Sequence, residues 1–202
     1  MRGRGGVVED VRVSNVTMYK IVNEGILITL RYQPTQPEPL SERTPAVRNI
    51  QISNINIRDA QRPAAIYGLD EMAVSHVSFN DIRSFSRQGI FLENTSGISF
   101  HDIDMEISEG SPLEAKDTKD LSWDKVSVNS PVIDHPYLKL NNCQEVRITN
   151  CYQPEKISNF IMKDEKCSNI YLINNILPGT DMPDKKKSNL VILKNNVTAN
   201  SL

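Results

Sequence analysis

The sequence predicts an all-β protein folded as a right-handed, single-stranded parallel β-helix of about seven to eight coils. Three observations predict this fold class. A six-residue pattern recurs along the chain, a second alternating segment precedes most of its copies, and the residues between the two segments match from repeat to repeat. Such self-similarity indicates a solenoid, because each repeat can bury its apolar face only against its neighbours.

The recurring pattern is apolar, any residue, apolar, polar, Asn or Asp, apolar. Its period-two alternation predicts a strand whose apolar side chains point to one side. Successive copies begin 39, 27, 21, 23, 25, 25 and 21 residues apart. Most of these intervals are too short for a propeller blade and fit one coil of three short strands. The copies are residues 11–16, 50–55, 77–82, 98–103, 121–126, 146–151, 171–176 and a degenerate 192–197.

A second strand is predicted about eight residues before the next copy, at residues 26–30, 66–69, 90–93, 113–116 and 138–141. Matching columns follow it. Thr95, Thr118, Cys143 and, after a one-residue slip, Cys167 share one column, and Asp70, Asn94, Asp117 and Asn142 share another. Like residues would stack there at the strand spacing of about 4.8 Å. The Asn residues of the repeated pattern are predicted to bend the chain at a corner, because Asn tolerates the left-handed conformation. They are Asn15, Asn54, Asn150, Asn175 and Asn196.

The three cysteines are predicted to be buried free thiols. Cys143, Cys151 and Cys167 are an odd number, so they cannot all pair within the chain, and none of their spacings is typical of zinc. Cys143 and Cys167 fit as small side chains in an inward turn column that also holds Thr. We therefore expect a structural role for them, and predict no metal site and no cofactor.

Residues 1–202 are predicted to form a single β-helix domain. The long first interval contains a proline-rich segment, so residues 31–47 are expected to project as a loop. Residues 177–202 are expected to form a degenerate last coil and a C-terminal cap.

Charge and hydrophobicity exclude some partners. There are 23 Lys and Arg against 25 Asp and Glu, a net charge of −2, and this balance does not favour nucleic acid. No apolar run approaches the roughly 20 residues of a membrane span. Residues 1–6 contain no apolar signal core, so the sequence does not indicate where the protein is located.

The first 55 residues carry a family resemblance. Residues 2–11 form a glycine-rich turn and strand, Ser14-Asn15-Val16 ends that strand, and residues 25–32 form a strand ending in Tyr32. These features, with residues 44–50, resemble glycoside hydrolase family 28, the polygalacturonases. The resemblance covers most of residues 1 to about 150 and is generic after residue 55. It implies a pectin-lyase-like solenoid, pectin or polygalacturonate as substrate, a secreted or periplasmic location, and substrate binding by Tyr32.

The catalytic motifs of that family are missing. Inverting hydrolysis of a uronic-acid linkage needs one carboxylic acid and one carboxylate base. The family supplies them from Asn-Thr-Asp and Asp-Asp motifs, flanked by Gly-His-Gly and Arg-Ile-Lys, and none of these occurs here. Counting back from Tyr32, the missing Lys would fall just before Met1. The resemblance is thus to the C-terminal portion only, no catalytic residue is predicted, and whether the chain is an enzyme stays open.

Other residues allow a site or a purely structural role. Glu93, Glu114, Lys116 and Lys139 should face outward on the second strand, where they could hold an anionic sugar or pair across coils. Tyr67 and Phe91, predicted at equivalent outward positions, could form a sugar-stacking platform or a covered pair. Asp102 with Asp104, and Ser130 with Asp134 and His135, contain catalytic residue types but are more typical of turns.

Three functions remain open. The chain is an incomplete part of a pectin-degrading hydrolase, a non-catalytic carbohydrate-binding or scaffold β-helix, or an enzyme whose acids come from another chain or a second copy. The open first coil of a β-helix exposes unpaired backbone groups. We therefore expect a second copy or an N-terminal fragment to pair there.

Overall fold

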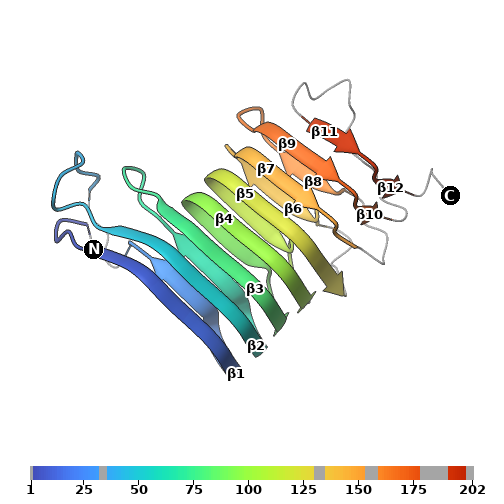
Figure 1. Ribbon diagram of the computed structural model, residues 1–202, viewed down its shortest axis with the longest axis horizontal. Helices are drawn as coiled ribbons and strands as arrows, with labels where there is room; N and C mark the ends of the chain where they lie inside the picture. The colour runs from blue at the N-terminus through green and yellow to red at the C-terminus, as the bar shows by residue number, and fades with distance from the viewer. Residues whose placement is uncertain (1, 32–35, 130–134, 153–158, 178–190, 199–202) are drawn as a thin grey trace.

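The computed structural model describes residues 2–31, 36–129, 135–152, 159–177 and 191–198. Within these ranges the chain is all-β and forms a right-handed parallel β-helix, as predicted. The strands stack in chain order from one end of an elongated molecule to the other (Figure 1). None of the described segments is a helix of the length and apolarity that a membrane crossing requires.

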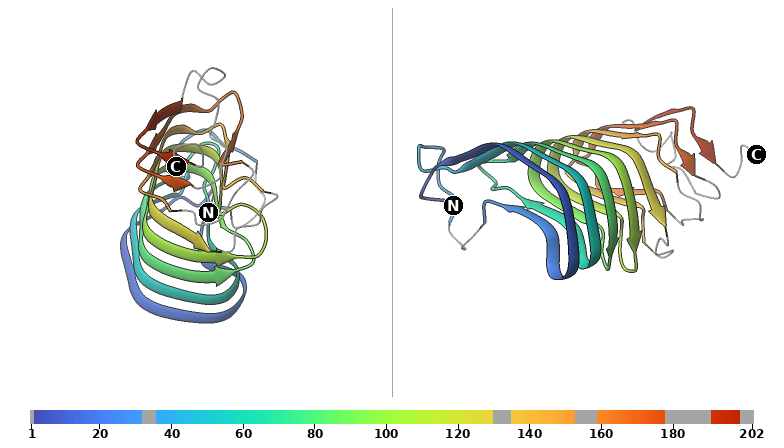
Figure 2. Two further views of the ribbon diagram at one scale, coloured as in Figure 1. Left: turned by 90° about the vertical axis from the view of Figure 1, so that its right-hand side faces the viewer. Right: turned by 60° about the horizontal axis from the view of Figure 1, so that its bottom comes forward.

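Five long strands form the first part of the solenoid, and shorter ones follow. The solenoid makes about five turns, slightly fewer than the predicted seven to eight coils. Figure 2 shows successive coils as nested outlines of similar shape. The strands are β1 (Val7–Thr29), β2 (Ala46–Tyr67), β3 (Val74–Ser86), β4 (Ile90–Ile107), β5 (Leu113–Asn129), β6 (Leu138–Asn141), β7 (Gln144–Thr149), β8 (Ile161–Lys163), β9 (Ser168–Ile173), β10 (Ile176–Leu177), β11 (Val191–Lys194) and β12 (Val197–Thr198).

The parallel register confirms the first six copies of the repeated pattern. Their first residues stand in one column, Val11, Ile50, Val77, Ile98, Leu121 and Val146. The last two copies were placed one residue too late, because Val146 pairs with Ile170 and Ile170 with Val191. Ile170 and Leu172 are fully buried, whereas Tyr171 is partly exposed. Burial of the more apolar alternating pair therefore fixes the register.

The same one-residue shift applies to the corner residues of the last coils. Asn15, Asn54 and Asn150 have φ of 61°, 52° and 54°, so they bend the chain as predicted. In the last coils this conformation belongs to Asn174 and Asn195, with φ of 56° and 51°, and the prediction for Asn175 and Asn196 was wrong. The Asn175 amide is buried instead, and its Nδ2 donates to Asn196 Oδ1 at 2.9 Å.

At the other corners, side-chain amides link neighbouring coils. Asn54 Nδ2 donates to Asn15 Oδ1 at 2.6 Å, and Asn49 Nδ2 donates to Asp10 Oδ1. In each of these pairs the donor belongs to the later coil and the acceptor to the earlier one. These bonds satisfy polar side chains at positions where the strand ladder is interrupted.

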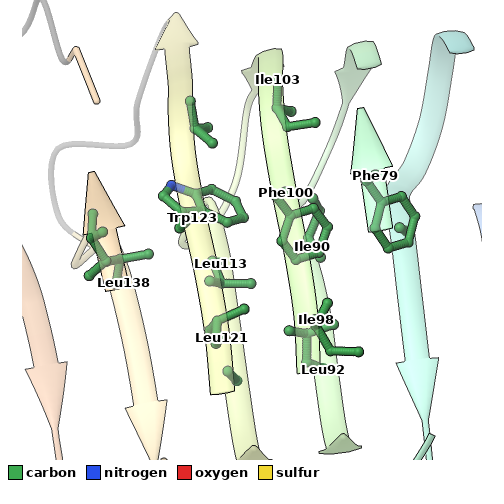
Figure 3. Close-up of a cluster of buried hydrophobic side chains, with 14 of the residues drawn as sticks. Phe79, Ile90, Leu92, Ile98, Phe100, Ile103, Leu113, Leu121, Trp123 and Leu138 are labelled. Atoms are coloured by element: carbon green, nitrogen blue, oxygen red, sulfur yellow. The ribbon is translucent and has the colours of Figure 1, made fainter. Parts of the chain in front are cut away.

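The core lies inside the coils, where like side chains stack. Phe79, Phe100 and Trp123 occupy one inward column on β3, β4 and β5 (Figure 3). The Phe79 and Phe100 rings stack with centroids 4.8 Å apart, and Trp123 meets Phe100 edge-on at 5.1 Å. Each such pair adds about 0.5–1.5 kcal/mol beyond simple burial.

The glycine-rich N-terminal turn contacts the described part of the segment between β1 and β2. Gly5 N donates to Arg43 O at 2.7 Å. Gly5 has φ of +66°, and a Cβ on it would lie 2.2 Å from Glu42 O. Only glycine fits there, which explains this part of the turn.

Candidate functional site

One outward-facing sheet carries the strongest candidate site. Residues 26–30, 64–67, 90–93, 113–116 and 138–141 lie side by side in successive coils, and we call them the groove sheet. Its inward column is Ile28, Ile66, Leu92, Ala115 and Leu140, which packs on the core. Alternate side chains therefore point outward, as the period-two pattern requires.

Two aromatic rings meet on the outward surface of this sheet. The Tyr67 and Phe91 centroids are 5.4 Å apart and their planes make an angle of 36°. The prediction that they are equivalent positions was wrong, because Tyr67 pairs with Glu93 and Phe91 pairs with Ala65. They are diagonal neighbours, which large side chains can still bridge. Both rings are only partly buried.

Two arginines flank these rings. The guanidinium of Arg31 lies 5.9 Å from the Tyr67 centroid, and that of Arg62 lies 5.5 Å from the Phe91 centroid. Backbone carbonyls fix both groups, since Arg31 Nε donates to Gly68 O at 2.8 Å and Arg62 Nη1 donates to Gly89 O at 3.1 Å. Cations in this position are attracted by the aromatic ring.

Glu93 ties this cluster together. Its carboxylate accepts from Arg31 Nη1 at 2.6 Å and from Lys116 Nζ at 2.8 Å. Burial acts to raise the pKa of Glu93, but the hydrogen bonds from Lys116 and Arg31 outweigh it, and the pKa is lowered. The same hydrogen bond raises the pKa of Lys116. Burial raises the pKa of Tyr67, so its hydroxyl stays protonated and can donate.

The mixed charges of the groove sheet pair across coils. Besides the Glu93 pairs, Lys139 Nζ lies 3.7 Å from Glu114 Oε2 in the neighbouring coil. Cross-strand pairing, one of the two predicted roles for this ladder, is therefore confirmed. Pairing also holds these side chains in place on the outer surface.

A polar cleft of about 650 Å³ borders the end of the groove sheet. The predicted corner column lines it: Asn94 Nδ2 donates to Asp70 Oδ1 at 2.7 Å, and Asn142 Nδ2 donates to Asp117 Oδ1 at 2.6 Å. The side chains of Lys116, Lys119 and Gln144 also line the cleft. Its walls thus offer hydrogen-bond donors and acceptors together with charges of both signs, since the carboxylates of Asp70, Glu71 and Asp117 line it beside the two lysines.

The other sequence candidates do not join this cluster. Tyr32, predicted to bind substrate, lies outside the described residues, as do Ser130 and Asp134. Asp102 is a corner residue with φ of 55°. The Asp104 carboxylate accepts hydrogen bonds from Arg83 Nη1 at 3.3 Å and from Asn129 Nδ2 at 3.2 Å. These bonds favour a structural role for Asp104 over a catalytic one.

The described carboxyl groups with clearly displaced pKa values are all lowered. They are Glu71, Glu93, Asp124 and Asp164. A glycosidase acid instead needs a raised pKa, so none of these four is suited to that role. Within the described ranges, no three His, Cys, Asp or Glu side chains gather in a way that could hold a metal ion.

The contacts of Arg31 and Arg62 with the aromatic pair were not predicted from the sequence. Both stand outside the alternating segments, one just after a groove strand and one just before. Their nearness to the strand ends was a signal, but the pattern could not show which way a long side chain turns.

Comparisons with known proteins support the fold. No protein-family model matches the chain, and no curated protein matches it in sequence. Among solved structures, the A-module of a mannuronan C-5 epimerase from Azotobacter vinelandii matches with a TM-score of 0.55 at 8% identity, over 96% of this chain. This chain spans 57% of the length of that structure. The likeness is one of fold.

Two further structures match at lower scores. A candidate glycosyl hydrolase from Parabacteroides merdae has a TM-score of 0.44 and 14% identity, over 78% of this chain and 80% of its own. The endo-xylogalacturonan hydrolase from Aspergillus tubingensis has a TM-score of 0.43 and 5% identity, over 78% and 62%.

Proposed function

We propose that the groove sheet binds a polysaccharide chain lying along the axis of the β-helix. The Tyr67–Phe91 pair with its two arginines is the observation that carries this proposal. A sugar ring has an apolar face that stacks on aromatic rings and hydroxyl groups that need polar partners at its rim. Coils about 4.8 Å apart would present such partners repeatedly along an extended polymer.

Within this proposal the polymer is a galacturonan or a related uronic-acid polysaccharide, as in pectin. Arg31, Arg62, Lys116 and Lys139 provide four cations along the groove sheet, against the two carboxylates of Glu93 and Glu114 with which three of them pair. Arginine suits carboxylates because it can donate two parallel hydrogen bonds. The resemblance of residues 1–55 to polygalacturonases supports the same class. The matched epimerase acts on mannuronan, another polysaccharide.

We further propose that this chain is the C-terminal β-helix part of a pectin-degrading, polygalacturonase-like hydrolase, and that it is catalytically incomplete by itself. It would supply the floor of the groove, while the acids come from elsewhere. A non-catalytic carbohydrate-binding or scaffold β-helix is the alternative. The ion pairs of Glu93 with Arg31 and Lys116, and of Glu114 with Lys139, favour it.

Calorimetric titration with oligogalacturonate tests the binding site. Phe91→Ala and Tyr67→Ala each remove a stacking ring, and we expect binding about 2- to 12-fold weaker, from an aromatic contact worth about 0.5–1.5 kcal/mol. Tyr19→Ala is the matched control, because Tyr19 is 59% exposed and lies on β1 outside the groove sheet. A neutral oligosaccharide of equal length tests the role of charge. Equal binding by all three variants would refute polysaccharide binding on the groove sheet.

Release of reducing ends from polygalacturonate tests catalysis. We expect none from the purified chain. Hydrolysis that grows with the dimer fraction would show that a second copy completes the site.

Loss of oligogalacturonate binding in Tyr32→Ala would support the role that the family resemblance gives Tyr32.

A further inference from the structure

Cys143 and Cys167 lie next to each other in consecutive coils. Both are free and fully buried. The residues after them, Gln144 and Ser168, are register partners, and Ser168 N donates to Cys143 O at 2.9 Å. Cys143 N donates to Cys167 Sγ at 3.3 Å, so one sulfur already contacts the other residue.

The column they share brings γ atoms together. Two coils earlier in it, Thr95 Oγ1 and Thr118 Oγ1 are 3.0 Å apart. Register partners on adjacent strands have Cα atoms about 4.8 Å apart, within the roughly 4.4–6.8 Å that a disulfide spans. The backbone therefore needs little movement to allow a bond between the two sulfurs.

The sulfurs differ in orientation and acidity. Cys167 Sγ lies near Leu140 O at 3.5 Å, on the side of the Cys143 coil, while Cys143 Sγ donates to Ala115 O at 3.4 Å, one coil further back. Rotation of the Cys143 side chain would turn its sulfur toward Cys167. Hydrogen bonding from Cys143 lowers the pKa of Cys167, although Cys167 Sγ also donates to Asp164 Oδ1 at 3.2 Å, which acts to raise it. The interaction with Cys167, together with burial, raises the pKa of Cys143, so Cys167 ionises first.

We infer that Cys143 and Cys167 form an inter-coil disulfide when the protein meets a small-molecule disulfide such as oxidised glutathione. Because both thiols are fully buried, the exchange proceeds through local opening of these coils. The Cys167 thiolate then attacks one sulfur of the reagent, and one glutathione thiolate leaves. Cys143 then loses its proton and attacks the Cys167 sulfur, which releases the second glutathione. Two protein thiols are oxidised, one reagent disulfide is reduced, and the two protons end on the two glutathione thiols.

Cys151 provides a control within the same molecule. It lies in another column, where its N–H donates to Asn175 Oδ1 at 2.9 Å and its sulfur lies 3.6 Å from Trp123 O. Burial raises the pKa of Cys151 to about 12, so its thiol stays protonated. We expect it to remain reduced.

Peptide mapping tests the inference on the native full chain. The protein is incubated with oxidised glutathione, its remaining thiols are alkylated, and it is digested with trypsin without reductant. Arg147, Lys156 and Lys166 place the three cysteines on separate peptides, residues 140–147, 148–156 and 167–185. We expect residues 140–147 linked to 167–185 and Cys151 alkylated. A link through Cys151, or a link that forms only in denaturant, would overturn the inference.

Stability measurements supply the second readout. Oxidation should raise the thermal midpoint of the wild-type chain and of Cys151→Ser by about 5–10 °C. Cys143→Ser should show no rise, because Cys167 then has no partner. An equal rise in Cys143→Ser would contradict the disulfide.

Discussion

At the scale of single residues, Glu93 connects the fold to the proposed binding surface. Its side chain is 14% exposed and accepts hydrogen bonds from Arg31 and Lys116, which belong to different coils. Arg31 in turn lies over the Tyr67 ring. The Glu93 carboxylate therefore holds both cations in place, and one of them, Arg31, contacts the aromatic pair.

Glu93→Gln should lower the free energy of unfolding by about 1 kcal/mol near neutral pH, because water screens the partly exposed Arg31 and Lys116. The folded-state pKa of Glu93 lies below its ordinary value of 4.5. The wild-type advantage is therefore complete above 4.5 and is lost as pH falls through the lower folded-state pKa. Urea unfolding of both proteins across this range measures it.

Glu109→Gln is the control for that experiment. Glu109 lies 4.0 Å from Arg87 and is more than half exposed, so we expect almost no change. A loss in Glu93→Gln that stays constant down to acid pH would show that shape, not charge, accounts for it.

At the scale of strands, the sequence predicted most of the register and failed in one place. The first six copies align because alternating apolar residues and a corner Asx occur at matching positions. In β9 the repeated pattern matches residues 171–176, with Asn175 at the corner, better than it matches residues 170–175, which the register selects. Burial of Asn175 reverses this, since its amide bonds inside the coil, and a pattern of polarity cannot distinguish a buried amide from a corner amide.

Substitutions at these two asparagines distinguish the registers. Asn175→Ala should destabilise the protein by about 2–4 kcal/mol, because it leaves Cys151 N and Ile148 O without their buried partners. Asn174→Gly should change stability by less than about 0.5 kcal/mol, since glycine accepts φ of 56° at no cost. Thermal unfolding measures both, and the reverse order of effects would support the register with Asn175 at the corner.

The candidate site, like the strand register, could be predicted from the sequence only in part. The outward ladder and the aromatic pair follow from alternation, and so they were visible in the sequence. The contacts of Arg31 and Arg62 depend on how long side chains turn at strand ends, which no period encodes. A repeated pattern does not show the two-residue offset between these coils, so the predicted equivalence of Tyr67 and Phe91 was wrong.

At the scale of the whole molecule, the first coil differs from those inside the stack. Val13 of β1 is 39% exposed, whereas its register partner Ile52 is 4% exposed. Val11, Val16 and Met18 are also only partly buried, although they continue core columns. Among the described strands, β1 pairs with β2 alone. We propose that a second copy, or an N-terminal fragment, packs on this open end.

Sedimentation at increasing protein concentration tests the second copy. We expect association of the wild-type chain, weakened at least about tenfold by Val13→Lys, because an unpaired charge would be buried at the contact. Phe85→Lys is the matched control, since Phe85 is 49% exposed on β3, away from the open end. A chain that stays monomeric at every concentration would exclude the second copy and leave an N-terminal fragment as the partner of the open end.

The corner amides also suggest how the solenoid is made. Asn49, Asn54, Asn94 and Asn142 all donate from a later coil to an acceptor on the coil before it. A coil that emerges from the ribosome thus meets acceptors already in place on its predecessor. The acceptors act as a template, and we expect the chain to wind in the direction of synthesis, one turn at a time.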